Sequence, residues 1–280
     1  MTQEINIGGV KFGGGRPLAL IAGPCVIESE GLVDECAARL KEISGRLGLG
    51  LVFKASFDKA NRSSLSSFRG PGLERGLAVL AGVREKYGLP LLSDIHETWQ
   101  VGPAAEVLDA LQIPAFLARQ TDLLTAAARG GRPVNVKKGQ FMAPEDLAQA
   151  AAKMSGQPGF AGLSFCERGS SFGYHNLVVD MRSFPIMAEL GWPVIFDATH
   201  SVQLPAASGR CSGGDRRFVP TLARAAVAAG VDGLFLETHP DPDRALCDGP
   251  NQWPLDQLEE MLKNLQAIDQ LRPRAAGGGA

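Results

Sequence analysis

The chain has 280 residues, a formal net charge of −2 and an apolar fraction of 45%. This length fits one large α/β barrel or two smaller domains, and it allows a substantial core. The near-neutral charge argues against a nucleic-acid partner, which usually meets a basic face, although local clusters of lysine and arginine can still bind anionic substrates.

The N-terminus and the cysteines predict the compartment. The first residues lack the charged and apolar regions of a signal peptide, and no apolar run reaches the roughly 18 residues that a membrane-spanning helix needs. The five cysteines are irregularly spaced and show no disulfide framework. We therefore expect a cytoplasmic protein with no membrane partner. Spacing alone assigns no role to Cys36, Cys166, Cys211 and Cys247.

Short apolar, β-branched runs alternate along the chain with longer amphipathic ones. We predict strands near residues 18–25, 51–57, 91–95, 110–115, 134–138, 160–167, 193–199 and 233–238. We predict helices near residues 31–48, 72–87, 99–108, 121–129, 145–154, 183–190, 217–229 and 255–271. The strand runs lack polar alternation, as expected for parallel strands covered on both faces. Eight strand–helix alternations predict a single (β/α)8 TIM barrel.

The segments outside this repeat carry predictions of their own. The Gly-rich N-terminus contains two β-prone pieces, INI and VKF, which predict a short hairpin capping the bottom of the barrel. We expect the catalytic barrel, hairpin included, to span residues 1–272 and the tail 273–280 to be disordered. Three loops after strands are long, at 58–71, 200–216 and 239–254, and such loops commonly build the substrate site.

Four potential metal ligands lie at or after the ends of predicted strands: Cys25, His200, Glu237 and Asp248. A barrel gathers the carboxyl ends of its strands at one face, so these distant residues can converge. A thiolate, an imidazole and two carboxylates suit zinc, iron, manganese or cobalt. Taken singly, each has a structural explanation, such as a buried cysteine or a turn-forming aspartate. His96, His175 and His239 compete as ligands, and spacing alone leaves the choice open.

Cationic side chains also gather at the predicted strand ends. They are Lys54, Lys59, Arg62, Lys137, Lys138 and Arg168. An unpaired ammonium inside a barrel strand is costly, so Lys54 needs an anionic partner. The set as a whole predicts a site for a small phosphorylated polyanion. For any single member, the alternative is a structural ion pair with Asp94, Glu167 or Asp197. The loop DKANRSS (58–64) adds compact donors, or else forms an ordinary polar surface loop.

A longer set of motifs covers most of the chain. The stretches are AGPCVIES (22–29), FKASFDKANRSS (53–64), SDIHE (93–97), QIPAFLARQTDLL (112–124), VNVKKGQF (134–141), ERGSSFGYHNLVVDMRS (167–183), FDATHSVQLP (196–205) and FLETHPDP (235–242). Together they closely resemble the 3-deoxy-D-manno-octulosonate 8-phosphate synthase family. The KANRS stretch (59–63) is the discriminating one, because the related 3-deoxy-D-arabino-heptulosonate 7-phosphate synthases resemble K-P-R-T-S there.

The resemblance implies a transferase that condenses phosphoenolpyruvate with D-arabinose 5-phosphate and water. The products are 3-deoxy-D-manno-octulosonate 8-phosphate and inorganic phosphate, on the route to bacterial lipopolysaccharide. The resemblance also implies a (β/α)8 barrel that assembles as a homotetramer. The alternatives are a heptulosonate synthase that uses erythrose 4-phosphate, a metal-dependent aldolase or lyase, and a non-catalytic phosphosugar-binding barrel.

The same motifs imply residue roles. The phosphoenolpyruvate contacts are Lys54, Ser56, Lys59, Lys137 and Arg168, with Gln112 and Ala115 lining the same pocket. The arabinose 5-phosphate contacts are Asn61, Arg62 and Ser63, with Asp94 near the sugar's reacting end and Gln203 closing over the sugar. Arg119 resembles a residue that reaches the sugar phosphate of a neighbouring subunit. Catalytic roles are implied for Lys54, Lys59, Asp94, Lys137 and Arg168.

The family has a metal-dependent class and a metal-independent class, which has Asn at the position of Cys25. The resemblance therefore implies a metal-dependent enzyme, with Cys25, His200, Glu237 and Asp248 as ligands and His239 as a non-ligand. One departure is the stretch CDGPN (247–251), which is closer to the metal-independent pattern C-D-G-P-S while it retains the aspartate. Because the metal-independent class runs the same reaction, we expect the metal to orient the aldehyde rather than to activate water.

Overall fold

The computed structural model describes residues 1–62, 64–205 and 213–272. Eight parallel strands form its central sheet: β3 (Ala19–Gly23), β4 (Leu51–Lys54), β5 (Leu91–Asp94), β6 (Ala110–Ile113), β7 (Val134–Lys137), β8 (Leu163–Glu167), β11 (Val194–Asp197) and β14 (Gly233–His239). The sheet closes because β14 pairs with both β11 and β3. The predicted (β/α)8 barrel is confirmed.

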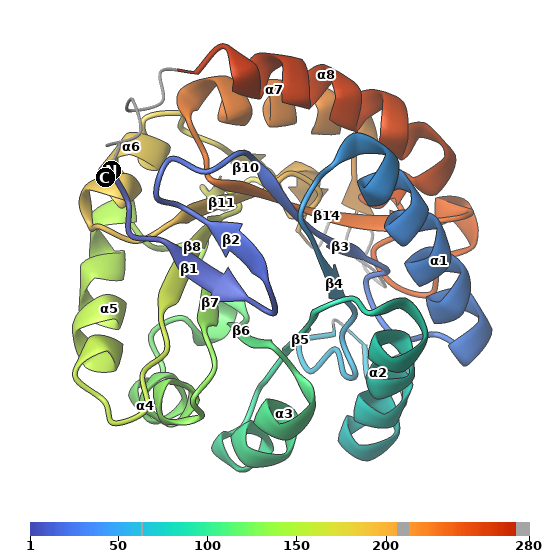
Figure 1. Ribbon diagram of the computed structural model, residues 1–280, viewed down its shortest axis with the longest axis horizontal. Helices are drawn as coiled ribbons and strands as arrows, with labels where there is room; N and C mark the ends of the chain where they lie inside the picture. Colours follow the sequence, from blue (N-terminus) through green and yellow to red (C-terminus); the bar gives the residue numbers. More distant parts are fainter. Residues whose placement is uncertain (63, 206–212, 273–280) are drawn as a thin grey trace.

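Eight helices surround the sheet (Figure 1): α1 (Glu30–Leu47), α2 (Leu73–Tyr87), α3 (Val101–Val107), α4 (Thr121–Arg129), α5 (Leu147–Ser155), α6 (Ser183–Glu189), α7 (Val219–Ala229) and α8 (Leu258–Gln270). Local signals set their ends. In α1, the Ser29 side chain accepts from the backbone N–H of Leu32, and Gly48 ends the helix at a φ of 62°. Pro114 directly follows β6, as its restricted backbone predicts. No helix in these residues is long and apolar enough to span a membrane.

The N-terminal hairpin lies across one end of the barrel, in front of the ring of strands in Figure 1. Its strands are β1 (Ile5–Ile7) and β2 (Val10–Phe12). Ile5, Ile7 and Phe12 are buried, and they pack against residues inside the barrel such as Ile21 and Phe235. The predicted hairpin cap at the bottom of the barrel is confirmed. The tail 273–280, predicted to be disordered, lies outside the described residues.

Strand alternation divides the barrel interior into an apolar floor and a polar upper layer. On β5, Leu92 belongs to the apolar cluster that also holds the hairpin, and Asp94 follows it two residues later. On β4, Val52 and Lys54 repeat this pattern, and both are buried. Side chains two residues apart on a strand share a face. The fold therefore places polar groups inside the barrel at the carboxyl ends of its strands.

Within the described residues, the loops also contain two short strand pairs and one short strand that extends the barrel sheet. β9 (Ser170–Ser171) pairs with β10 (Leu177–Val178), and β12 (Gln203–Leu204) pairs with β13 (Gly213–Gly214). β15 (Trp253–Pro254) runs parallel to the end of β14. The sequence pattern predicted none of these pairs.

Candidate active site

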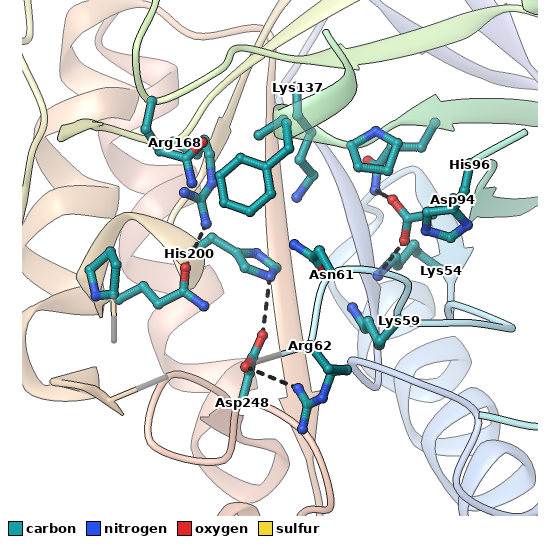
Figure 2. A pocket seen from close by; sticks show the side chains of 17 residues that line it. Lys54, Lys59, Asn61, Arg62, Asp94, His96, Lys137, Arg168, His200 and Asp248 are labelled. Carbon is teal, nitrogen blue, oxygen red and sulfur yellow. Dashed lines mark hydrogen bonds and ion pairs between the residues drawn. The ribbon is translucent and has the colours of Figure 1, made fainter. Parts of the chain in front are cut away.

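A cavity of about 280 Å³ opens at the carboxyl ends of the strands. Figure 2 shows lysine, arginine and histidine side chains that face it from separate elements. Twelve of the predicted site residues line it: Lys54, Lys59, Asn61, Arg62, Asp94, Gln112, Ala115, Lys137, Arg168, His200, Gln203 and Asp248. The remaining lining residues are His96, Pro114, Phe116, Gln140 and Pro205. The barrel thus brings most of the predicted set into one space.

Lys54 is the centre of a buried ionic cluster at the floor of the cavity. Its Nζ lies 3.0 Å from Glu237 Oε1 and 3.3 Å from Asp94 Oδ2. It also donates to Ser56 Oγ at 2.8 Å. Lys59 Nζ lies 3.4 Å from the same Glu237 oxygen. The anionic partner that burial of Lys54 requires is therefore present as two carboxylates.

The charges of this cluster support one another. Burial opposes ionisation of Asp94 and Glu237, but nearby cations outweigh it and hold the pKa of both carboxyls well below their ordinary range. Burial likewise opposes the charged forms of Lys54 and Lys59, yet the surrounding anionic groups raise the pKa of both ammonium groups. Both lysines are thus held as cations.

Two further cations face the cavity from β7 and from the loop after β8. Lys137 forms an ion pair with buried Asp197, and its Nζ lies 3.4 Å from the centroid of the Phe235 ring. Arg168 Nη2 donates to Gln203 Oε1 at 2.9 Å, while its buried Nη1 has no hydrogen-bond partner among the residues that the structure describes. A buried guanidinium with a free donor is suited to bind an anionic ligand.

Three predicted contacts lie elsewhere. Ser56 is fully buried, and its hydroxyl donates to Asp94 while it accepts from Lys54, so it supports the cavity from behind. Arg119 is exposed and does not line the cavity of its own chain. Ser63 lies outside the described residues, as does Cys211.

The other three predicted metal ligands, Cys25, His200 and Glu237, lie close to Asp248. His200 Nε2 lies 3.4 Å from Glu237 Oε2 and 3.8 Å from Asp248 Oδ2. Cys25 Sγ lies 3.8 Å from the same Asp248 oxygen. Two groups of potential ligand atoms result, each within 4.8 Å: Cys25, Cys247 and Asp248, and His200, Glu237 and Asp248.

The residues present fit a divalent metal. Among the described residues, buried Glu237 Oε2 accepts no hydrogen bond, and His200 Nε2 lies 3.4 Å from it, so this oxygen is available to a cation shared with His200. His200 Nδ1 lies 2.7 Å from Asp197 Oδ2, a contact that directs Nε2 toward the other ligands. Burial raises the pKa of the Cys25 thiol, which a bound metal would reverse by stabilising the thiolate. His239 Nδ1 instead accepts from the Asp241 N–H, and His239 belongs to neither group.

Cys247 is the main neighbour that the sequence pattern did not single out. Its Sγ lies 2.9 Å from Cys25 Sγ and accepts a hydrogen bond from Arg62 Nη1 at 2.9 Å. The only feature of the sequence that pointed to Cys247 was its position next to the predicted ligand Asp248. That position does not by itself show that the loop after β14 folds back against β3.

Comparisons with known proteins relate the chain to one family. Residues 2–273 match the model of the DAHP synthetase I family. Similar proteins named 2-dehydro-3-deoxyphosphooctonate aldolase occur in Geobacter sp. (strain M21), with 61% identity, and in Geobacter metallireducens, with 62% identity. Each alignment covers 96% of this chain and 98% of the relative. A protein of the same name from Syntrophotalea carbinolica is 61% identical over 96% of this chain and 97% of its own length. The chain belongs to the DAHP synthetase I family.

Proposed function

We propose that this chain is a transferase that condenses phosphoenolpyruvate with D-arabinose 5-phosphate and water. The products are 3-deoxy-D-manno-octulosonate 8-phosphate, on the route to lipopolysaccharide, and inorganic phosphate. The observation that carries the proposal is the convergence of Lys54, Lys59, Lys137 and Arg168 in one cavity beside Asn61 and Arg62. Two phosphorylated substrates and a carboxylate require such a concentration of fixed cations. The names of the similar proteins support the same octulosonate product.

Phosphoenolpyruvate is assigned to the deeper cations. Lys54 and Lys59 neutralise its carboxylate, because both are held as cations at the cavity floor. Lys137 and Arg168 hold its phosphate, for which Arg168 has a free donor at Nη1. Gln112 and Ala115 line the same space, and Ser56 supports Lys54 from behind.

Arabinose 5-phosphate is assigned to the loop 58–71. Asn61 and Arg62 line the cavity from this loop, and Ser63 continues it. Asp94 lies beside Lys54 in the cavity (Figure 2), and we assign it to the reacting end of the sugar. Gln203, held by Arg168, lines the cavity and is assigned to the sugar. Residues 206–212, which follow it in the loop 200–216, lie outside the described residues.

The chemistry joins C3 of phosphoenolpyruvate to the sugar aldehyde carbon, and water adds at C2. The tetrahedral hemiketal phosphate then loses inorganic phosphate by cleavage of its carbon–oxygen bond. Lys59 stabilises the alkoxide that develops on the aldehyde oxygen. Lys137 and Arg168 retain contact with the phosphate group through the intermediate and neutralise it as it leaves.

Cys25, His200, Glu237 and Asp248 are proposed to hold a divalent metal, whether zinc, iron, manganese or cobalt. When bound, such an ion supplies Lewis-acid orientation and polarisation of the aldehyde. Glu237 also holds Lys54 and Lys59, so it links the metal ligands to the phosphoenolpyruvate site.

We further propose a cytoplasmic homotetramer in which residues 1–272 form the catalytic unit. Exposed Arg119, which does not line its own cavity, is then available to the sugar phosphate of a neighbouring copy. The four cysteines in the described residues are free, which fits a reducing compartment.

Phosphate release from phosphoenolpyruvate tests the function. With arabinose 5-phosphate as acceptor we expect rapid release, and with erythrose 4-phosphate little or none. A preference for erythrose 4-phosphate would favour a heptulosonate synthase, and binding of both substrates without release would favour a non-catalytic barrel. The same assay with a chelator, followed by addition of single metals, identifies the ion that supports turnover.

A further inference from the structure

Below the cavity, four polar side chains form a row across neighbouring strands. Asp94 on β5 is the register partner of Gln112 on β6, and Gln112 is the partner of Asn135 on β7. Asn135 is in turn the partner of Ser164 on β8. Register partners on adjacent strands direct their side chains to the same face, so all four project together into the barrel. Ser164 and Asn135 are fully buried, and neither lines the cavity.

A continuous chain of hydrogen bonds joins this row. The Ser164 hydroxyl donates to Asn135 Oδ1 at 2.9 Å, and Asn135 Nδ2 donates to Gln112 Oε1 at 2.9 Å. Gln112 Nε2 then donates to Asp94 Oδ1 at 2.6 Å. Every donor in the row therefore points toward the Asp94 carboxylate.

The chemistry of the four side chains requires this direction. An ionised carboxylate only accepts hydrogen bonds, so Gln112 must present its amide nitrogen to Asp94. The Gln112 carbonyl oxygen then faces Asn135, which must present its own amide nitrogen. The remaining Asn135 oxygen requires a donor, and the Ser164 hydroxyl supplies it. The identity of each residue thus fixes the orientation of the next.

The row holds one oxygen of Asp94, while cationic and hydroxyl groups hold the other. Asp94 Oδ2 accepts from Ser56 and lies 3.3 Å from Lys54 Nζ. Only the Gln112 amide reaches Oδ1 within the described residues. The plane of the Asp94 carboxylate therefore depends on where the Gln112 amide is held.

We propose that Asn135 is a positioning residue, which fixes the Gln112 amide and thereby the orientation of Asp94 at the sugar's reacting end. The role in catalysis rests on the proposed function of the cavity. Asn135 does not touch substrate. It acts through Gln112, and Ser164 supports it by satisfying its oxygen.

The variant Asn135→Leu tests the proposal, because leucine has the same number and branching of side-chain heavy atoms as asparagine, though with bulkier methyl groups, and cannot donate to Gln112. We expect kcat to fall about 30-fold, in line with loss of a hydrogen bond that orders a charged group. The KM values of both substrates should change less than about threefold, because the lysines and arginines that hold the phosphates are untouched. The Ser164→Ala variant leaves the Asn135 donor in place, so its kcat should fall by less than about threefold.

A double-mutant cycle separates positioning from a general packing effect. In a Gln112→Leu background, adding Asn135→Leu should lower kcat by no more than about a further threefold. The Gln112 amide, through which Asn135 acts on Asp94, is already absent there. Equal losses in both backgrounds, or a rise in both KM values with kcat unchanged, would overturn the proposal.

A crystal structure of Asn135→Leu provides a readout that does not need activity. We expect Gln112 Nε2 to leave hydrogen-bond distance of Asp94 Oδ1, and an unchanged Gln112 would refute the positioning role. Thermal melting of each variant shows whether it is still folded. Ser44→Ala, which removes a buried hydroxyl on α1 far from the cavity, is the control for loss of a buried polar group. Phosphate release by the wild-type chain tests the proposed function separately. The positioning role of Asn135 is tested only by the ratios of kcat between the variants.

Discussion

Arg62 connects the predicted sugar site with the loop that carries Asp248. Its Nη1 lies 3.7 Å from Asp248 Oδ1, and its Nη2 donates to the Leu246 carbonyl at 3.3 Å. These contacts hold the guanidinium at the cavity wall, where it is available to a sugar phosphate. The residues that we propose as substrate contacts thus also order one another.

We predict that Arg62→Ala raises the KM for arabinose 5-phosphate about 30-fold, since a charge-assisted contact is lost. The KM for phosphoenolpyruvate should change less than about threefold, because its proposed cations remain. Steady-state kinetics with each substrate varied in turn measures both values. Arg75→Ala on the exposed surface of α2 is the matched control. Equal rises in the two KM values would contradict the assignment of Arg62 to the sugar.

Cys25 allows a test of what the metal contributes. We predict that Cys25→Asn retains appreciable turnover in the presence of a chelator, because the other cavity groups can orient the substrates while asparagine replaces the thiolate. Phosphate release with and without chelator measures this. Cys36→Ala, a change in a buried cysteine of α1, should remain as sensitive to the chelator as the unmodified chain. Complete loss of turnover in a folded Cys25→Asn variant would point instead to metal-activated water.

At the scale of elements, the hairpin and β14 depend on one another. A side-chain carbon at Gly233 would lie 2.8 Å from the Phe12 ring, so glycine at this position makes room for the hairpin. Phe12 is fully buried in the apolar floor of the barrel. The bottom of the barrel is therefore closed by packing between residues more than two hundred positions apart.

We predict that Gly233→Ala destabilises the fold by about 1–3 kcal/mol, the usual cost of overpacking a tight core. The double variant Gly233→Ala, Phe12→Leu should lose less than the sum of the two single changes, because the smaller side chain relieves the clash. Chemical denaturation gives the free energies of unfolding. Gly82→Ala, in an open position on α2, should not destabilise the fold. Additive losses would show that Gly233 and Phe12 do not interact.

The sequence predicted the barrel elements well because each has a strong local pattern. The run GLFLE gave β14, and the spacing of leucines in 255–271 gave α8, with ends displaced by a few residues. The β9–β10 and β12–β13 pairs are only two residues long, too short for a periodic pattern. They form because the loops fold back on themselves, which local sequence does not encode.

The site was predictable where a polar residue ends an apolar strand. Lys54 and Asp94 stand out in this way, and Glu237 interrupts an otherwise apolar run. Asn135 is a small polar residue within the strand VNVK. Its hydrogen-bond partners are set by the register of β7 with both neighbouring strands, which the sequence does not show. The contact of Cys247 with Cys25 likewise depends on tertiary folding, which spacing cannot show.

At the scale of the whole molecule, several large aromatic side chains remain exposed in the loops around the cavity. Phe116, Phe141 and Phe172 are 54%, 59% and 62% exposed. Phe116 also lines the cavity, and the Phe141 ring lies against Gly139 beside the Ala115 carbonyl. Exposed aromatic groups of this kind commonly mark a surface that another protein covers. They support an assembly in which a second copy approaches the cavity near exposed Arg119.

Such an assembly predicts complementation between two impaired variants. Arg119→Ala should raise the KM for arabinose 5-phosphate in its neighbour's site, and Arg168→Ala should disable its own site. Co-expression with two different tags, followed by purification on both, isolates mixed oligomers. Some of their sites combine Arg168 from one subunit with Arg119 from another, so at low arabinose 5-phosphate they should show activity that neither parent shows. Sedimentation gives the oligomeric state. A monomer, or a mixed oligomer no more active than its parents, would exclude a shared site, because every cavity would then have to be completed by its own chain.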